Sequence, residues 1–285
     1  MSHRWACLLG HPVAHSLSPA LHNAAFRALH IDANYEAWDV PPEGLDKAVA
    51  ALRRADCMGA NVTAPHKQAV VPLMDEVSDE VQALGVLNTI VNDNGRLIGS
   101  NTDARGLVQW LRAAGIDPAG GPCLVLGAGG AARATVWALA DMGATSILIL
   151  NRTPQRAHEL VSTLQPRVKA EVTWGNLSRA AQPTAVPSHV VVNATSLGHH
   201  GQAPDVHPSW YSPDSVAIEL AYNPPETAFM VAGRAAGARA ENGLGMLLHQ
   251  AALAFERWTG QAPPMDVYES VLRQAQHEPL KEKAS

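Results

Sequence analysis

The hydrophobic positions of this chain follow two alternating patterns. Short apolar runs, typical of strands buried on both faces of a sheet, are separated by longer segments with apolar residues at helical spacing. The expected strands cover residues 5–10, 34–40, 58–62, 123–126, 146–150, 170–173, 190–193, 216–220 and 238–241. The expected helices cover residues 19–29, 45–54, 67–73, 106–114, 130–142, 154–164, 226–236, 244–258 and 265–276. Strands that alternate with helices predict an α/β fold with mostly parallel sheets.

Two local signals refine this prediction in the first third of the chain. Residues 86–91 and 96–99 flank Asp93-Asn94-Gly95, a sequence typical of tight turns, so this pair should form an antiparallel hairpin. Ser18 and Pro19 precede an apolar helical pattern. We expect Ser18 to cap that helix, because a serine hydroxyl can accept a hydrogen bond from a free N–H of the first turn.

A glycine-rich turn lies near the middle of the chain, between an expected strand and an expected helix. Gly127 permits a sharp turn, Gly129 lets the backbone approach a pyrophosphate, and the small Ala132 allows the helix to pack closely on the strand. The first N–H groups of the helix and the positive end of its dipole favour a bound phosphate. A turn that merely joins two elements is the alternative, but the order of strand, turn and helix favours a dinucleotide site. Its residues would be Gly127, Ala128, Gly129, Gly130 and Ala131.

The end of the following strand distinguishes NAD from NADP. Sites for NAD usually carry an Asp or Glu there, which accepts hydrogen bonds from the ribose hydroxyls. Here the strand ends in Asn151, Arg152 and Thr153, and Arg156 follows one helical turn later. Since this segment has two guanidinium groups and no carboxylate to repel a 2′-phosphate, we expect NADP(H) as the cofactor. For Arg156, an ordinary solvated helix face is the alternative.

The length and composition of the chain suit two domains. At 285 residues and 47% hydrophobic content, it can form two cores of ordinary size. We expect a substrate-binding and catalytic domain from residues 1–103 plus 243–285, with a Rossmann-type NADP-binding domain, residues 104–242, inserted between its two parts. The C-terminal helices would then complete the N-terminal lobe.

Charge and hydropathy narrow the class of partner. The formal net charge is −5, from 26 acidic and 21 basic residues without a basic stripe, so nucleic acid is not an expected partner. No apolar segment approaches the roughly 20 residues of a membrane span, and the first residues do not resemble a signal peptide. We therefore expect a cytoplasmic protein with a small-molecule substrate and no membrane partner. The sequence leaves the choice between monomer and homodimer open.

The cysteines and histidines do not predict a metal site. Cys7, Cys57 and Cys123 lie far apart and lack the spacing of metal ligands, as is common in a reducing compartment. Among the 13 histidines, His11 and His15, like His199 and His200, lie close together in loops rich in Gly and Pro, without a carboxylate partner at ligand spacing. We expect no bound metal.

Three polar clusters outside the glycine turn could carry chemistry. Residues 15–19 bring two hydroxyls to a helix start, where they could hold a carboxylate, although helix capping alone would explain Ser18. Residues 61–67 run from a strand into a proline-containing turn that presents Lys67, which could also be an ordinary solvated lysine. Residues 88–89 and 101–103 place amides and a carboxylate at the two ends of the expected hairpin, where Asn and Asp are common in turns.

Taken together, these clusters, the glycine turn and the segment from Gly243 to Gln250 resemble the shikimate dehydrogenase family. The resemblance runs from about Gly10 to Gln250 and involves at least six separated motifs. It implies a two-lobed fold and the reversible reduction of 3-dehydroshikimate to shikimate with NADPH, a step of aromatic amino-acid biosynthesis.

The resemblance also implies roles for single residues. The substrate would be bound by Ser16, Ser18, Thr63, Asn88, Tyr222 and Gln250. Thr195, Leu220 and Gly243 would contact the cofactor, in addition to the residues of the glycine turn and of the strand end at 151–156. Lys67 and Asp103 would form the catalytic pair beside the hydroxyl that becomes a ketone. A lysine removed from water can exchange a proton near neutral pH, but which of the two groups moves the proton is left open.

Four positions depart from the usual family pattern and keep other functions open. They are Val86, Ala104, His199 and Glu219. None removes a proposed catalytic group, yet together they leave room for a related enzyme that acts on quinate or an aminated shikimate. A non-catalytic NADPH-binding sensor is a further alternative. The presence of both Lys67 and Asp103 argues against it, because a pure binder has no need of a proton-transfer pair.

Overall fold

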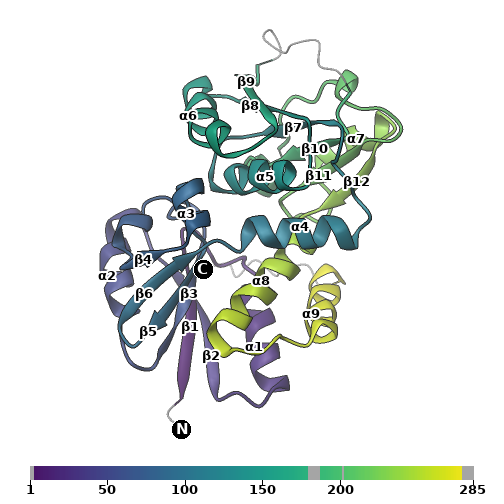
Figure 1. Ribbon diagram of the computed structural model, residues 1–285. Helices are drawn as coiled ribbons and strands as arrows, with labels where there is room; N and C mark the ends of the chain where they lie inside the picture. Colours follow the sequence, from purple (N-terminus) through teal and green to yellow (C-terminus); the bar gives the residue numbers. More distant parts are fainter. Residues whose placement is uncertain (1–2, 179–186, 201, 278–285) are drawn as a thin grey trace. The chain divides into compact units, whose positions relative to one another are not determined.

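The computed structural model describes residues 3–178, 187–200 and 202–277 of the chain, the side chains of His199, His200, Gln276 and His277 excepted (Figure 1). It has α/β architecture, as predicted, and divides into two compact units. The first unit comprises Met1–Thr102 and Leu248–Ser285, and the second comprises Asp103–Leu247. In the described part of the chain, no helix combines the length and apolar character needed to cross a membrane.

The first unit contains a six-stranded mixed sheet in the order β2-β1-β3-β5-β6-β4. Its strands are β1 (Arg4–Gly10), β2 (Ala33–Asp39), β3 (Cys57–Val62), β4 (Glu76–Val77), β5 (Thr89–Asp93) and β6 (Arg96–Ser100). Strands β2, β1 and β3 are parallel, whereas β5 runs antiparallel to both β3 and β6. The predicted hairpin is therefore confirmed, and the C-terminal ends of β1 and β3 lie at the same edge of the sheet.

Helices cover both faces of this sheet (Figure 1). They are α1 (Ser18–Ala28), α2 (Leu45–Ala51), α3 (Asp79–Leu84), α8 (Leu244–Thr259) and α9 (Met265–His277). Val49 of α2 packs with Cys7, Ala60 and Ile90 in one core cluster. On the other face α1 contacts α9, and the ring of Phe26 lies 5.1 Å from that of Phe255.

Two predictions for this unit were wrong, and one helix was missed. The segment 67–73 forms turns and a short 3-10 helix at Val71–Leu73, because Pro72 cannot donate the backbone hydrogen bond that a longer helix needs. Ser18 is the first residue of α1, whereas Leu17 occupies the cap position, and Ser18 makes no capping hydrogen bond. The six-residue helix α3, which the Ser78 side chain caps, was not predicted.

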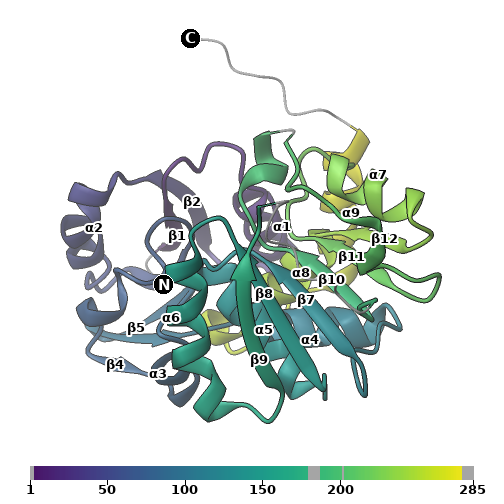
Figure 2. The ribbon, with the colours of Figure 1, turned by 90° about the horizontal axis from the view of Figure 1, so that it is seen from above.

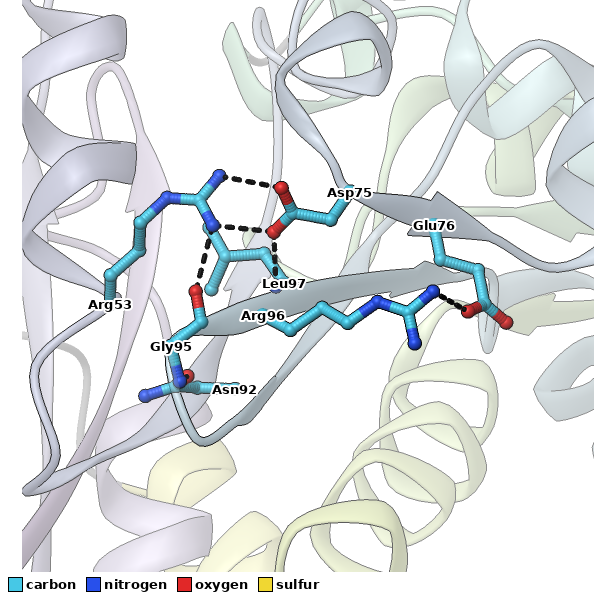
Figure 3. Close-up of polar contacts among 7 residues, drawn as sticks. All are labelled: Arg53, Asp75, Glu76, Asn92, Gly95, Arg96 and Leu97. Carbon is cyan, nitrogen blue, oxygen red and sulfur yellow. Dashed lines mark hydrogen bonds and ion pairs between the residues drawn. The ribbon is translucent and has the colours of Figure 1, made fainter.

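A group of charged residues ties the β5–β6 hairpin to the segment before β4 (Figure 3). Arg53 binds both carboxylate oxygens of Asp75 and donates to the Gly95 carbonyl, 2.8 Å away. Asp75 also accepts a hydrogen bond of 2.7 Å from the Leu97 N–H. The Arg53 guanidinium and this N–H hold the pKa of Asp75 below its usual value. The hairpin that leads to the polar cluster at 101–103 is thus fixed at its turn and at β6.

A histidine lies in the aromatic core between α1 and the C-terminal helices. His22 is completely buried, and its ring lies 4.5 Å from that of Tyr35 and 5.2 Å from that of Trp258. Its Nδ1 is 2.9 Å from the Tyr268 hydroxyl of α9. Burial lowers the pKa of His22 to about 3, so the ring is neutral in the folded protein.

This histidine should make the protein less stable as the pH falls. Between pH 6.5 and about 3 the unfolded chain protonates His22 and the folded chain does not, so the free energy of unfolding decreases with falling pH. The shift corresponds to about 2 kcal/mol between pH 7 and pH 5. We expect His22→Gln to flatten the pH dependence of urea unfolding by this amount, whereas His30→Asn, at an exposed position, should not. Equal slopes in both variants would contradict the assignment.

The second unit has the Rossmann strand order. Its six parallel strands are arranged as β12-β11-β10-β7-β8-β9 (Figure 2). They are β7 (Pro122–Leu126), β8 (Ser146–Asn151), β9 (Glu171–Asn176), β10 (Val190–Asn193), β11 (Val216–Glu219) and β12 (Arg239–Asn242). The helices are α4 (Asp103–Ala113), α5 (Gly130–Asp141), α6 (Pro154–Leu164) and α7 (Ala228–Ala235). The strand order reverses between β7 and β10, and ligands of such sheets bind outside the carboxyl ends of the strands at that point.

Candidate functional site

The glycine turn follows β7 at the point where the strand order reverses. Gly127 has φ +108°, a conformation that favours glycine, and its N–H donates to the Leu150 carbonyl at 2.8 Å. Gly129 precedes α5, and no described atom lies within 4 Å of a Cβ added to it. Ala132 is completely buried beneath the turn. The turn therefore has one packed side and one open side, which fits a phosphate at a helix start.

The end of β8 carries the two arginines expected to bind the 2′-phosphate. Asn151 ends the strand, and its side-chain amide donates to the Thr153 carbonyl at 2.8 Å, which shapes the connection to α6. Arg152 and Arg156 are both exposed, and neither forms an ion pair with a described residue. Two such guanidinium groups beside the glycine turn fit an anionic group on the ribose.

The other predicted cofactor residues lie at the carboxyl ends of β10, β11 and β12. Thr195 is in the loop after β10, and an added Cβ on Gly127 would lie 3.3 Å from its methyl group. The Leu220 N–H, after β11, donates to the Asn193 carbonyl at 3.1 Å. Gly243 lies against the Leu220 carbonyl so closely that a Cβ would be 2.0 Å from the oxygen. The fold thus brings the sequence-predicted cofactor residues to one edge of one sheet.

In the first unit, the turn after β3 holds Thr63 and Lys67, both half-buried. The Thr63 N–H donates to the Leu9 carbonyl at 2.9 Å, and the Leu87 N–H donates to the Lys67 carbonyl at 2.9 Å. Beneath the turn, the buried His66 ring places Nε2 2.6 Å from the Val40 carbonyl. The backbone that carries Lys67 is therefore held to β1 and to the residue before Asn88.

Asn88 is the centre of a buried polar network. Its side-chain oxygen accepts from the Thr102 N–H at 2.7 Å and from the Thr89 hydroxyl at 3.0 Å. Its side-chain nitrogen donates to Gln250 Oε1, 3.3 Å away on α8. The Asn61 side chain donates to the Asn88 carbonyl at 3.2 Å. Two motifs 162 positions apart thus meet through their side chains, and both can offer hydrogen-bonding groups to a hydroxylated ligand.

Ser16 and Ser18 lie in the loop after β1 and at the start of α1. The Ser18 N–H donates to the Ser16 hydroxyl oxygen at 3.2 Å, which leaves the Ser16 hydrogen available for a ligand. The Ser18 hydroxyl forms no hydrogen bond with a described residue. The loop also joins the Lys67 turn, because the His11 N–H donates to the Ala64 carbonyl at 3.0 Å.

Asp103 and Tyr222 belong to the second unit. Asp103 is buried at the first position of α4 and directly follows Thr102, which binds Asn88. Tyr222 is half-buried and follows the end of β11. Among the described residues, His, Cys, Asp and Glu side chains do not gather in groups of three that could hold a metal ion.

The sequence did not identify the residues that orient Asn88. Asn61, Thr89 and Thr102 are all buried and all bind its amide or its carbonyl. Each belongs to one of the three polar clusters predicted from the sequence. Their convergence on Asn88, however, depends on the antiparallel register of β3 and β5, in which Asn61 lies opposite Thr89.

Three family models match the chain. A model described as the shikimate dehydrogenase substrate binding domain matches residues 8–90, and one described as shikimate / quinate 5-dehydrogenase matches residues 117–200. A third, described as the shikimate 5'-dehydrogenase C-terminal domain, matches residues 243–275.

Relatives and solved structures are similar over nearly the whole chain. The shikimate dehydrogenase (NADP(+)) of Moorella thermoacetica is 44% identical over 271 residues, which are 94% of this chain and 92% of that protein. Shikimate 5-dehydrogenase from Thermus thermophilus, solved with NADP(H) and shikimate, has a TM-score of 0.84 and 39% identity, covering 95% of this chain and 99% of that one. Quinate dehydrogenase from Corynebacterium glutamicum, solved with NAD, has a TM-score of 0.84 and 28% identity over 95% of this chain and 99% of that one.

Proposed function

The chain belongs to the shikimate dehydrogenase family, and on that premise we propose that it catalyses the reversible, NADP-dependent reduction of 3-dehydroshikimate to shikimate in aromatic amino-acid biosynthesis. The observation that carries the proposal is the side-chain contact of Asn88 with Gln250, next to the turn that carries Lys67, whose carbonyl binds the Leu87 N–H. Such a set of amides and an amine suits a ring with several hydroxyls.

The proposed binding roles follow from the hydrogen-bonding capacity of each group. Ser16 and Ser18 donate to the substrate carboxylate, and Tyr222 adds a third hydroxyl. Thr63, Asn88 and Gln250 bind the ring hydroxyls. Because Asn88 is held from several sides, its amide needs no further ordering when the substrate binds.

The proposed chemistry divides between the cofactor and the protein. Bound NADP(H) supplies the hydride in the reductive direction and takes it up in the other. Lys67 and Asp103 hold the reacting oxygen and move its proton. On the second unit, the glycine turn would hold the pyrophosphate, and Arg152 and Arg156 would hold the 2′-phosphate.

A comparison of substrates and cofactors tests this function. Initial rates would be measured with shikimate and with quinate, each with NADP and with NAD. We expect the highest kcat/KM for shikimate with NADP, because the segment 151–156 carries arginines in place of a carboxylate. Faster oxidation of quinate would favour the quinate-specific alternative. Tight NADPH binding without oxidation of either acid would favour a sensor.

Replacing Ser16 should affect binding more than turnover. Ser16→Ala removes a donor to the substrate carboxylate, and a hydrogen bond to a charged group contributes roughly 1.5–3 kcal/mol. We expect the KM for shikimate to rise about 10- to 100-fold while kcat changes little. Ser209→Ala, which removes an exposed hydroxyl hydrogen-bonded to His207, is the control. An unchanged KM in Ser16→Ala would remove Ser16 from the carboxylate site.

We further propose that the enzyme works in the cytoplasm as a monomer or homodimer. The three cysteines are free and buried, which is compatible with a reducing compartment. Burial also raises the pKa of the Cys57 thiol to about 12, so its reactive thiolate form is disfavoured. Light scattering at micromolar concentration would decide between monomer and dimer.

A further inference from the structure

A carboxylate that has no part in the proposed mechanism lies completely buried at the end of β11. Glu219 is paired in register with Asn193 of β10 and Asn242 of β12. Burial raises its pKa, while the groups that donate to it act in the opposite direction. No described lysine or arginine forms an ion pair with it. A buried carboxylate without a cation is costly, so its surroundings must compensate through hydrogen bonds.

All the hydrogen bonds to Glu219 are donated by its neighbours. Oε2 accepts from the Asn193 side-chain nitrogen at 2.7 Å and from the Thr227 hydroxyl at 3.1 Å. Oε1 accepts from the Ala221 N–H at 3.1 Å. The backbone of Gly198 also lies against the carboxylate, since a Cβ there would be 2.9 Å from Oε2. Glu219 therefore supports the loop after β10, through its hydrogen bond with Asn193 at the end of β10 and its contact with Gly198 in the loop.

These contacts determine which group donates in the hydrogen bonds between Asn193 and Thr195. Because the Asn193 nitrogen donates to Glu219, the Asn193 oxygen must face Thr195. That oxygen accepts from the Thr195 N–H at 3.1 Å and from the Thr195 hydroxyl at 2.7 Å. A threonine hydroxyl has one hydrogen, and here it is used within the protein. Its oxygen already accepts from the Leu197 N–H at 3.4 Å. Towards any other group, the Thr195 hydroxyl can only accept, through its remaining lone pair.

Thr195 lies where the second half of a dinucleotide would bind. It follows β10 and adjoins the glycine turn after β7, on the two sides of the point where the strand order reverses. With the pyrophosphate at the glycine turn and the 2′-phosphate at the end of β8, the other nucleotide half must lie on the β10 side. The half-buried Thr195 would then face the nicotinamide half.

We infer that Glu219 is a positioning residue, which makes the Thr195 hydroxyl an acceptor for the carboxamide N–H of the nicotinamide ring. This inference rests on the proposed function, because it requires a bound NADP. The carboxamide carries an N–H₂ donor, whereas the acetyl group of the acetylpyridine analogue of NADP has none. A Thr195 hydroxyl that can only accept should therefore favour NADP over this analogue. A hydroxyl free to donate should not, because it can bind the carbonyl oxygen that both groups carry.

Binding to the cofactor-free protein, measured by titration calorimetry, tests this preference without turnover. We expect the wild-type protein to bind NADP roughly tenfold more tightly than the acetylpyridine analogue, because one hydrogen bond is made with NADP and left unmade with the analogue. Thr195→Val, which removes the acceptor and keeps the shape of the side chain, should bring the two Kd values within about twofold of each other.

Glu219→Gln tests the positioning role itself. A glutamine can accept on one side only, so its amide nitrogen opposes either the Asn193 nitrogen or the Ala221 N–H. This weakens the contact that orients Asn193. Asn193 should then turn, at the cost of its hydrogen bond from the Thr195 N–H, and present a donor to the Thr195 hydroxyl, whose hydrogen points outward. We expect the preference for NADP to disappear. In Asn193→Asp/Glu219→Gln the introduced aspartate accepts both from the glutamine amide and from Thr195, so the preference should return to within about twofold of the wild type.

The outcomes separate this inference from the proposed function. If the wild-type protein binds neither dinucleotide, the proposed function fails. If it binds NADP but does not discriminate against the analogue, or if Glu219→Gln discriminates as the wild type does, the inference is overturned and the proposed function stands. If the single variant does not fold, the double variant decides, and a double variant that folds without discrimination, or does not fold, assigns Glu219 a purely structural role.

Discussion

Replacing Lys67 with alanine should lower kcat for shikimate oxidation by roughly 10²- to 10⁴-fold, the range for loss of a general acid–base group, and should change the KM for shikimate much less. The turn that carries Lys67 is fixed by the bond from the Leu87 N–H to its carbonyl and lies beside Asn88. The backbone of Lys67 is therefore held at a defined place, next to the segment that carries the proposed ring-hydroxyl ligand Asn88. Steady-state kinetics with saturating NADP measures both constants.

Lys47→Ala is the matched control for this experiment. Lys47 is an exposed lysine on α2 of the same unit, and its removal changes the net charge equally. It should leave kcat within about twofold of the wild type, as is usual for surface substitutions. Near-normal turnover in Lys67→Ala would remove Lys67 from the mechanism, and a large rise in KM at unchanged kcat would make it a binding group.

The elements that the sequence predicted best are those whose signal is local. Cys123 to Leu126 is apolar throughout, and the glycines after it fit only a turn that leads into a helix, so β7, the turn and α5 were all placed within one residue of their observed bounds. The second unit consists of such strand and helix repeats. Its parallel sheet followed from the pattern because the inner strands β7, β10 and β11 are buried almost throughout.

The elements that failed depend on contacts that periodicity does not contain. In the segment 67–73 the apolar residues suggested a helix, but Pro72 has no N–H to donate, and the Lys67 carbonyl accepts from the Leu87 N–H outside the segment. Helix α3 has six residues, too few for a helical period to be visible, and only the Ser78 cap marks its start. Ser18 did not act as a cap because the helix already begins at Ser18, which leaves Leu17 in the cap position.

For the candidate site, single residues could be chosen from the sequence but their geometry could not. The resemblance supplied Asn88 and Gln250 as binding residues, whereas their direct contact requires α8 to return to the first sheet. The support of Asn88 by Thr102 and Asn61 depends on strand register. Glu219 was noted only as a departure, because nothing in its sequence neighbourhood shows that it binds Asn193 and Thr227.

Replacing both Arg152 and Arg156 with alanine should raise the KM for NADP by roughly 10²-fold or more, and the KM for NAD by little. The reason is the 2′-phosphate, which only NADP carries. Each charged hydrogen bond to it contributes about 1.5–3 kcal/mol, and two such bonds together correspond to at least this factor. Both guanidinium groups are exposed and have no ion pair with a described residue, so no described carboxylate competes with the 2′-phosphate for them. Kinetics with each cofactor at saturating shikimate measures the change in preference.

The single variants divide this effect and test its origin. Arg152 follows β8 directly, whereas Arg156 lies on the exposed face of α6, so Arg152→Ala should account for the larger share. Arg167→Ala, at another exposed position of the same unit, should change neither KM. Since the interaction is between charges near the surface, the preference of the wild-type protein for NADP should weaken as the salt concentration rises. Equal losses with NADP and NAD in the double variant would show that the arginines support the fold or the shared parts of the dinucleotide, and the 2′-phosphate would then have to be recognised elsewhere.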